Sequence, residues 1–191
     1  VNYEMKDETI GYIELITFSE NAAVETSDAL KELKAQGAQA IVLDLRYNGG
    51  GLLDKCIDIA NLFVPKGTVV TISGRKFEKT SFNSSGKGLG MPLVVLVNEG
   101  TASASEILAG AIQDHEVGTL VGKTTFGKGL VQNSYELRDG SYVKVTIAEY
   151  LTPKGRSIHG IGLEPDVMVE GDEEQLAKAL ELAKAESEKT F

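Results

Sequence analysis

The stretch that decides the fold is AIVLDLRYNGGG, residues 40–51. Its first six residues are apolar apart from Asp44, which is typical of a strand covered on both faces. Such strands belong to parallel sheets of α/β proteins, where crossover helices cover the two faces. The glycine-rich turn that follows predicts a tight reversal at the carboxyl end of the strand. We therefore expect an α/β fold with a mixed, mostly parallel sheet flanked by helices.

Strand and helix patterns alternate on both sides of this stretch. The early part predicts strands at 10–18, 68–73 and 92–98, with helices between Asn21 and Gly37 and at 52–63. The later part predicts a helix at 106–113, strands at 119–122, 131–137 and 142–152, and a final helix at 173–187. Residues 75–90 are rich in serine, lysine and glycine and are predicted to form a surface loop. Polar and apolar residues alternate over 142–147, as in a half-buried antiparallel strand.

Composition excludes several classes of protein. The 191 residues are 42% hydrophobic and 25% charged, which is ordinary globular composition. A net charge of −9 argues against a nucleic-acid partner, because such binding depends on lysine and arginine. Apolar runs reach about six residues, whereas a membrane span needs roughly 20, and the first residues show no signal peptide. The single cysteine, Cys56, has helical spacing to apolar neighbours and is predicted to lie in the core.

The stretch TASASE, residues 101–106, is the second candidate turn of the site. It joins an apolar strand to a helix, and it lies at the carboxyl end of its strand, as the glycine turn does. Small residues allow a tight turn that exposes a hydroxyl and directs unpaired N–H groups toward an anion. An alternative interpretation is structural, because Ser103 and Glu106 have the spacing of a capping box.

A nucleophilic serine needs a base. His115 and His159 lie in polar or glycine-rich segments and are predicted to be surface residues. A neutral lysine can serve instead, and Lys123 and Lys128 follow in GKTTFGKGLVQ. Lys128 stands between two glycines just after Phe126, so we expect the loop to place its amine in an apolar pocket that favours the neutral form. The alternative is a solvated lysine in a flexible turn.

Four segments together resemble the carboxy-terminal processing proteases, also called tail-specific proteases. They are DLRYNGGGLL (44–53), VNEGTASASEILAGAIQDH (97–115), GKTTFGKGLVQ (122–132) and YLTPKGRSIHGIGLEPD (150–166). Their order and their coverage of most of the chain make the resemblance specific. It implies a ClpP/crotonase-like core and a single protease catalytic domain over residues 1–191. The PDZ-like domain that family members usually carry before this core is expected to be absent from this chain.

The resemblance also implies the roles of individual residues. The nucleophile of the family corresponds to Ser103, the first serine of the ASASE core, and not to Ser105. The general base corresponds to Lys128, and Gln132 is expected to orient it. The resemblance therefore implies a serine endopeptidase with a Ser-Lys dyad and an acyl-enzyme intermediate.

An oxyanion hole is part of the same resemblance. Its donors are expected to be the backbone N–H of Ala104 and that of Gly49 or Gly50, and the motifs do not choose between the two glycines.

No cofactor and no metal are implied. The expected partners are protein or peptide substrates with an accessible C-terminal segment, and a homo-oligomer is left open. The family resemblance implies an extracytoplasmic setting such as the periplasm, the cell envelope, a lumen or the medium.

Two alternatives come from other classes of protein. A crotonase-like acyl-CoA enzyme would use glycine-rich turns for a thioester oxyanion and would not need the hydroxyl of Ser103. A non-catalytic module would bind peptides by strand addition, with Ser103 as a helix cap and Lys128 in solvent.

Overall fold

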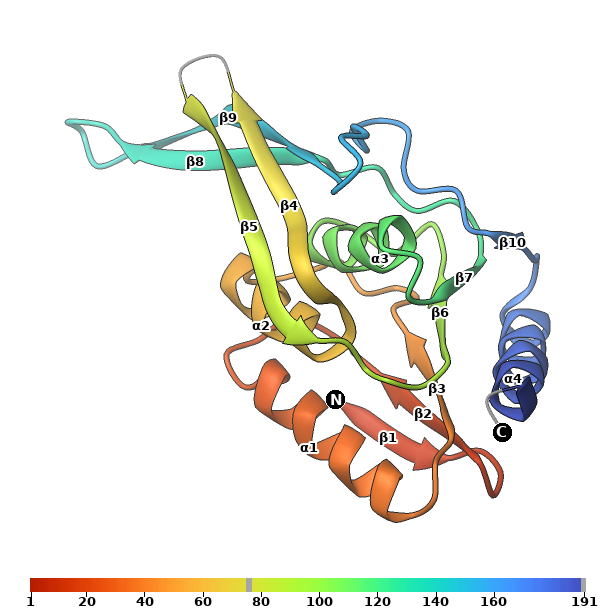
Figure 1. Ribbon diagram of the computed structural model, residues 1–191. Coiled ribbons are helices and arrows are strands. Elements are labelled where there is room, and N and C mark those ends of the chain that lie inside the picture. Colours follow the sequence, from red (N-terminus) through yellow and green to blue (C-terminus); the bar gives the residue numbers. More distant parts are fainter. Residues whose placement is uncertain (75–76, 190–191) are drawn as a thin grey trace.

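The computed structural model describes residues 1–74 and 77–189 of the chain, whose strands form two sheets (Figure 1). The first sheet has the strand order β1-β2-β3-β6-β7-β10. Its strands are β1 (Asn2–Met5), β2 (Ile10–Glu14), β3 (Ala40–Asp44), β6 (Leu93–Val97), β7 (Thr119–Gly122) and β10 (Val167–Met168). All of its pairs are parallel except β1 with β2. The predicted mostly parallel α/β sheet is confirmed.

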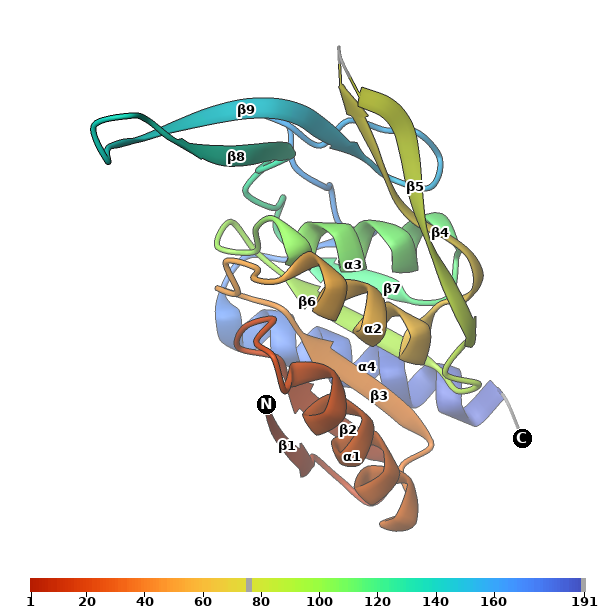
Figure 2. The same cartoon turned by 90° about the vertical axis from the view of Figure 1, so that its left-hand side faces the viewer.

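Helices cover both faces of this sheet (Figure 2). They are α1 (Ala22–Ala35), α2 (Leu53–Phe63), α3 (Ala104–Asp114) and α4 (Asp172–Lys189). The core on one face joins Ile41 and Leu43 of β3 to helices α1, α2 and α3. The core on the other face joins Val42 to α4. Every residue of β3 is buried, as expected of a central parallel strand between two helical layers.

The second sheet is antiparallel and has the order β5-β4-β9-β8. Its strands are β4 (Pro65–Gly74), β5 (Phe77–Lys87), β8 (Leu130–Glu136) and β9 (Tyr142–Leu151). In both views β8 and β9 form a hairpin that projects away from the helices (Figures 1 and 2).

Two predictions about this sheet are wrong. Within 75–90, residues 77–87 form strand β5 and not a loop, because they pair with β4, and Ser84 is buried there with its hydroxyl on Val64 O at 2.8 Å. The predicted antiparallel pairing of β9 is confirmed, but its alternating part is not half-buried, since Val143 and Val145 are each 41% exposed. The hairpin extends beyond the core, so both of its faces meet solvent near its tip.

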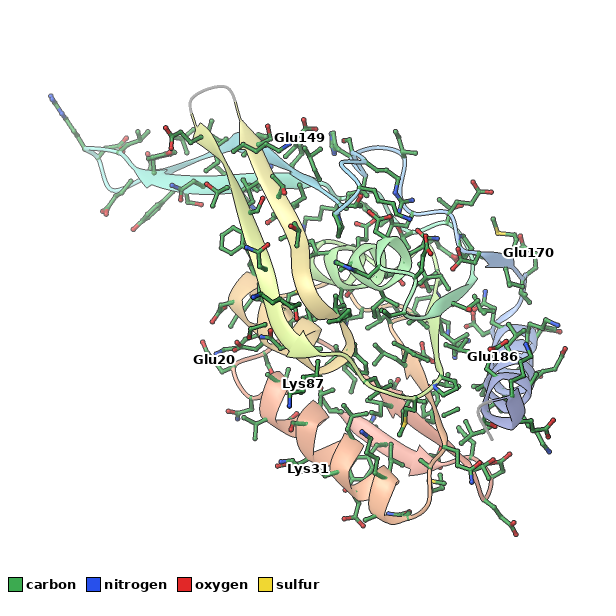
Figure 3. All side chains as sticks on the ribbon, in the orientation of Figure 1. Glu20, Lys31, Lys87, Glu149, Glu170 and Glu186 are labelled. Carbon is green, nitrogen blue, oxygen red and sulfur yellow. The ribbon has the colours of Figure 1, made fainter. Side chains whose placement is uncertain are left out.

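Charged side chains surround the molecule. Of the labelled residues of Figure 3, Glu149 is half-buried and the other five are exposed, namely Glu20, Lys31, Lys87, Glu170 and Glu186. Among the described residues, no helix combines the length and apolar character that crossing a membrane requires.

Candidate active site

The two candidate turns meet at the carboxyl edge of the parallel sheet. Strands β3 and β6 are parallel neighbours, with Asp44 paired to Leu96 at their carboxyl ends. The glycine turn after β3 and the serine turn after β6 therefore leave the sheet side by side. This juxtaposition was expected if the two strands were neighbours, and it is confirmed.

Ser103 is held in a strained conformation at the mouth of α3. Its backbone has φ 59° and ψ −117°, a region that non-glycine residues rarely occupy. Such a conformation costs about 1–3 kcal/mol and is typical of functional sites, where the surrounding structure holds it in place. The residue is half-buried and comes immediately before the first residue of the helix, Ala104. Its hydroxyl thus lies where the helix directs unpaired N–H groups.

The glycine turn packs directly against this serine. A Cβ on Gly50 would lie 2.9 Å from three atoms of the serine turn, namely Ala102 O, Ala104 N and Ser103 Cβ. Gly50 also has φ 99°, so a side chain is excluded both by space and by backbone conformation. Gly49 is exposed, and a Cβ there would meet nothing within 4 Å.

Three hydrogen bonds tie the serine turn to the end of β3 and the glycine turn. The Thr101 hydroxyl donates to Leu45 O at 2.8 Å, and the Ala102 N–H donates to Asn48 O at 3.0 Å. The Ser105 hydroxyl donates to the same Asn48 oxygen at 2.9 Å. Thr101, Asn48 and Ser105 are all fully buried. These hydrogen bonds were not predicted from the sequence, although the small polar residues in and beside the two turns could have indicated them.

Asn48 also fixes the glycine turn from within. Its side-chain amide donates to Leu15 O at 2.5 Å, and its Oδ1 accepts the N–H of Gly50 at 2.9 Å. The N–H of Gly50 is therefore already engaged. Among the described residues, neither the N–H of Gly49 nor that of Ala104 has a hydrogen-bond acceptor in the structure.

Glu106 connects the serine turn to the lysine turn. The carboxylate is fully buried, and its Oε2 accepts the backbone N–H of Ser103 at 2.9 Å and that of Lys128 at 2.8 Å. Its Oε1 accepts the Thr125 hydroxyl at 2.6 Å and the Gly127 N–H at 2.7 Å. The sequence predicted a capping box, and the bond from the Ser103 N–H to Glu106 is the part of it that also serves the site. The role of Glu106 toward the lysine turn was missed, because it depends on contacts across about twenty residues.

The side chains of Lys128 and Gln132 are both exposed. The expected apolar pocket around Lys128 is thus not formed, and that prediction is wrong for the conformation described. The glycines on both sides of Lys128 pack closely against residues 158–162, and the lysine side chain turns outward from them. The Gln132 amide lies 3.4 Å from the Thr146 hydroxyl on β9, which is a long hydrogen bond.

The two histidines and the cysteine lie outside the candidate site or are buried in the core. His115 is half-buried at the far end of α3 from Ser103, with Nε2 2.7 Å from Thr68 O, and is not the surface residue that was predicted. His159 is exposed as predicted. Cys56 is fully buried, as predicted, and its thiol lies 3.2 Å from Ala104 O. Burial raises the pKa of this thiol, which keeps it protonated and unreactive.

Arg46 connects the glycine turn to α4. Its guanidinium bonds both oxygens of Asp44, with the shortest contact at 2.6 Å, and donates to Asp172 O at 2.7 Å. The Tyr12 hydroxyl donates to the same Asp44 carboxylate at 2.7 Å. This partly buried network fixes the end of β3 just before the glycine turn.

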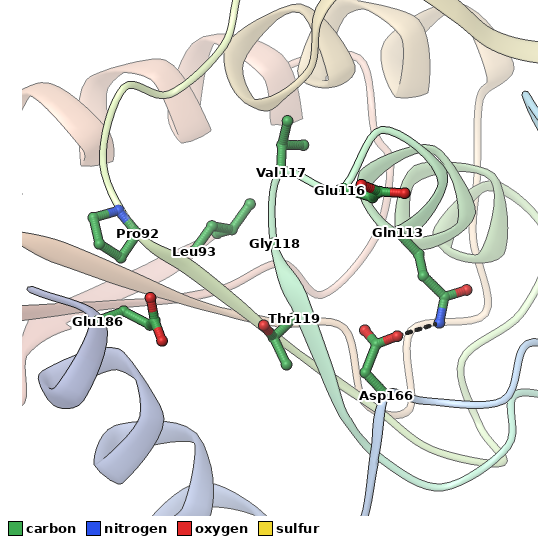
Figure 4. A pocket seen from close by; sticks show the side chains of 9 residues that line it. All are labelled: Pro92, Leu93, Gln113, Glu116, Val117, Gly118, Thr119, Asp166 and Glu186. Atoms are coloured by element: carbon green, nitrogen blue, oxygen red, sulfur yellow. Dashed lines mark hydrogen bonds between the residues drawn. The ribbon is translucent and has the colours of Figure 1, made fainter. Parts of the chain in front are cut away.

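A separate hollow of about 380 Å³ lies at the amino ends of β6 and β7, away from the two turns (Figure 4). Its lining includes a hydrogen bond of 3.0 Å from Gln113 to Asp166. The hollow contains none of the residues of the serine, glycine or lysine turns. Its lining residues are Pro92, Leu93, Gln113, Glu116, Val117, Gly118, Thr119, Asp166 and Glu186.

Known proteins match this chain over most of its length. The model of the family described as peptidase family S41 matches residues 9–169. A carboxyl-terminal-processing protease from Synechocystis sp. is 52% identical over 85% of the chain, which spans 38% of that relative. The carboxy-terminal processing protease CtpA of Bacillus subtilis is 44% identical over 87% of the chain, which spans 36% of that relative.

Solved structures agree with this assignment. The photosystem II D1 C-terminal processing protease matches with a TM-score of 0.78 and 42% identity, over 88% of this chain and 46% of that one. The resemblance inferred from the four motifs is thereby confirmed. The chain belongs to peptidase family S41, among the carboxy-terminal processing proteases.

Proposed function

We propose that this chain is the catalytic core of a serine endopeptidase that cleaves protein or peptide substrates near their C-terminal tails. Its family and the names of its relatives support the reaction class. Because the chain spans well under half of those relatives, the activity and the tail preference are assigned here as a proposal.

One observation carries the proposal, namely the shared oxygen of Glu106. Oε2 accepts the backbone N–H groups of both Ser103 and Lys128, so the backbones of the two residues lie side by side. The lysine amine is attached through a flexible four-carbon stem. We assign to this stem a rotation that brings the amine from solvent toward the serine hydroxyl. A substrate chain that covers the turn would exclude water from the amine and favour its neutral form.

The chemistry then follows in two steps. Neutral Lys128 takes the proton of the Ser103 hydroxyl as the oxygen attacks the peptide carbonyl, and it returns that proton to the leaving amine. Water, activated by the same amine, then attacks the acyl-enzyme and releases the new carboxylate. Gln132, four residues after Lys128, is assigned to hold the amine in its inward position.

The oxyanion is assigned to the N–H groups of Ala104 and Gly49. Ala104 supplies the first N–H of α3, where the helix dipole also favours negative charge. Gly49 is preferred to Gly50 because the Gly50 N–H already donates to Asn48 Oδ1. Loss of one such donor typically slows acyl transfer by about 10²–10³-fold.

The decisive experiment compares the two serines of the turn. An unstructured polypeptide is incubated with wild type, Ser103→Ala and Ser105→Ala, and the cleavage positions are read by mass spectrometry. We expect Ser103→Ala to abolish cleavage and labelling by a serine-directed phosphonate, with an unchanged circular dichroism spectrum. Ser105→Ala should cleave the same bonds more slowly. Cleavage by Ser103→Ala at the wild-type rate would rule the proposal out, and acyl-CoA binding that ignores Ser103 would favour the crotonase-like alternative.

The base is tested against the other lysine of its segment. Lys128→Ala should abolish turnover, whereas Lys123→Ala should keep it, because the Lys123 amine is engaged by Glu170 at 3.1 Å and by Glu99 at 3.8 Å. Gln132→Ala should lower kcat and leave stability unchanged, since its side chain is exposed. Equal activity of Lys128→Ala and wild type would exclude Lys128 as the base.

Two further proposals accompany this function through the family resemblance. One is an extracytoplasmic setting, which fractionation of cells that express the full-length protein would test. The other is assembly into a homo-oligomer, which sedimentation of the purified protein would test.

A further inference from the structure

The outer side of β8 is a strand edge that begins at the lysine turn. β8 is the last strand of the antiparallel sheet and pairs with β9 alone among the described strands. Its first residue, Leu130, comes two residues after Lys128. The edge therefore leads away from the proposed base along the projecting hairpin (Figures 1 and 2).

The hydrogen bonds at both ends of β8 show which residues face outward. Before the strand, Gly129 O accepts from Tyr150 N at 2.8 Å, and after it, Leu137 N donates to Ser141 O at 2.7 Å. Inward and outward backbone groups alternate along an antiparallel strand. The intervening even-numbered residues therefore direct their N–H and C=O groups away from β9. They are Leu130, Gln132, Ser134 and Glu136.

This edge is more regular than the opposite edge of the sheet, β5. β5 pairs with β4 through three register shifts, and bulges of this kind discourage further pairing. β8 has one shift, between Val131 and Gln132, and is regular from Gln132 to Glu136. An open, regular strand edge is a template for another extended chain.

One face of the hairpin is also apolar beside this edge. Tyr135 lies directly opposite Val143 in the register, and Val145 lies two pairs further toward the core, opposite Asn133. Their side chains share a face and are each between 41% and 45% exposed. An added strand would find apolar contacts there for alternate side chains.

We infer, on the basis of the proposed function, that the edge of β8 binds the substrate polypeptide as an added β-strand that extends from the scissile bond along the hairpin. The substrate is the expected added strand because the edge begins at the lysine turn, next to the proposed site of cleavage. Recognition through main-chain hydrogen bonds selects extended, unstructured segments and depends little on their sequence. The edge thus selects for an unfolded region, and the apolar face adds a preference for apolar side chains at alternate positions.

The test removes one outward N–H and leaves the ladder to β9 intact. Proline lacks an N–H and is tolerated in an edge strand where that group faces solvent, so Ser134→Pro is the variant and Ser134→Ala the control. We expect Ser134→Pro to lower kcat/KM for a long unstructured polypeptide about fivefold, through KM, since one hydrogen bond is lost. Turnover of a short ester substrate and phosphonate labelling of Ser103 should not change. Ser134→Ala should match wild type on both substrates.

A second measurement uses the wild-type enzyme and does not depend on how the variant folds. A series of long peptide substrates, N-methylated at one position each, should lose cleavage at every second position along one side of the scissile bond. Uniform cleavage across that series, or unchanged kcat/KM for Ser134→Pro, would overturn the inference. So would a change in sedimentation of Ser134→Pro without any change in cleavage, since the edge would then join copies of the chain. Absence of all turnover and labelling in wild type would instead contradict the proposed function.

Discussion

The serine and glycine turns differ sharply from the lysine turn and its hairpin. Asn48, Thr101, Ser105 and Glu106 are fully buried, and each makes hydrogen bonds that leave little freedom to its neighbours. The backbone of Lys128 lies beside them, yet its side chain is exposed, and the hairpin that follows extends into solvent. The groups proposed to stabilise a developing charge are fixed in advance, whereas the proposed base and the proposed substrate-binding edge remain accessible. Preorganised donors need this rigidity because reorientation during the reaction would reduce their effect.

The largest expected effect comes from breaking the rigid side at Gly50. Gly50→Ala places a Cβ 2.9 Å from two backbone atoms of the serine turn, at a φ that disfavours alanine. We expect turnover to fall about 1,000-fold and the free energy of unfolding to fall by about 3 kcal/mol. Initial rates and urea unfolding measure the two effects. Gly49→Ala is the control, since its Cβ meets open space and its N–H remains. Equal losses in the two variants would contradict the assignment of these glycines.

Glu106→Gln tests the connection between the two regions. A glutamine nitrogen cannot accept, so two of the four bonds to this side chain are lost, and two buried donors are left unsatisfied. We expect kcat to fall about 100-fold as the lysine turn shifts relative to Ser103, with KM nearly unchanged. The free energy of unfolding should fall by about 2–4 kcal/mol. The exposed Glu188→Gln serves as control, and wild-type kcat in Glu106→Gln would show that the tether is dispensable.

Two serine hydroxyls, one donating to a backbone carbonyl and one to a carboxylate, allow a buried and an exposed hydrogen bond to be compared. The Ser105 hydroxyl bonds Asn48 O at 2.9 Å in the core, and the Ser141 hydroxyl bonds Asp139 at 2.6 Å in the exposed turn of the hairpin. Ser105→Ala should lower kcat about tenfold and stability by about 1–2 kcal/mol, because the Asn48 carbonyl loses a buried donor. Ser141→Ala should change stability by less than about 0.5 kcal/mol. Thermal melts and initial rates of the two variants decide whether burial makes the difference.

The smallest effect concerns how folding stability depends on pH through Tyr12, whose hydroxyl bonds Asp44 just before the glycine turn. Burial, and then the hydrogen bond to Asp44, raise the pKa of Tyr12 above the ordinary value of about 10. The unfolded chain therefore loses this proton first as pH rises, so the stabilisation is complete below pH 10 and declines above it. Tyr12→Phe should cost about 1 kcal/mol at neutral pH and remove this part of the alkaline decline. Urea unfolding between pH 8 and 11 measures both, and identical alkaline slopes would contradict the prediction.

The elements of the parallel core were predictable because periodicity and turn chemistry agree there. The apolar run of β3, the glycines after Asn48 and the small residues before α3 each identified their own element. The adjacency of β3 and β6 then brought the turns together. Local patterns of this kind are sufficient to predict the fold where successive parallel strands are joined by regular crossover helices.

The remaining features depend on contacts between distant segments. The exposure of Lys128 results from the packing of its flanking glycines on residues 158–162, which the local sequence GKG does not reveal. Strand β5 forms from a serine-rich segment because β4 pairs with it, so tertiary pairing overrides a composition typical of loops. The role of Glu106 likewise appears only when the lysine turn folds back onto α3.

The bond from Arg46 to Asp172 has a consequence for the order in which the enzyme matures. Ribosomes complete α4 after every other element of the site, and Arg46 gains its carbonyl acceptor on that helix only then. The segment before the glycine turn consequently lacks one of its supports while the chain is still being synthesised. Docking of α4 therefore completes the hydrogen bonding of this segment as the last step of its assembly.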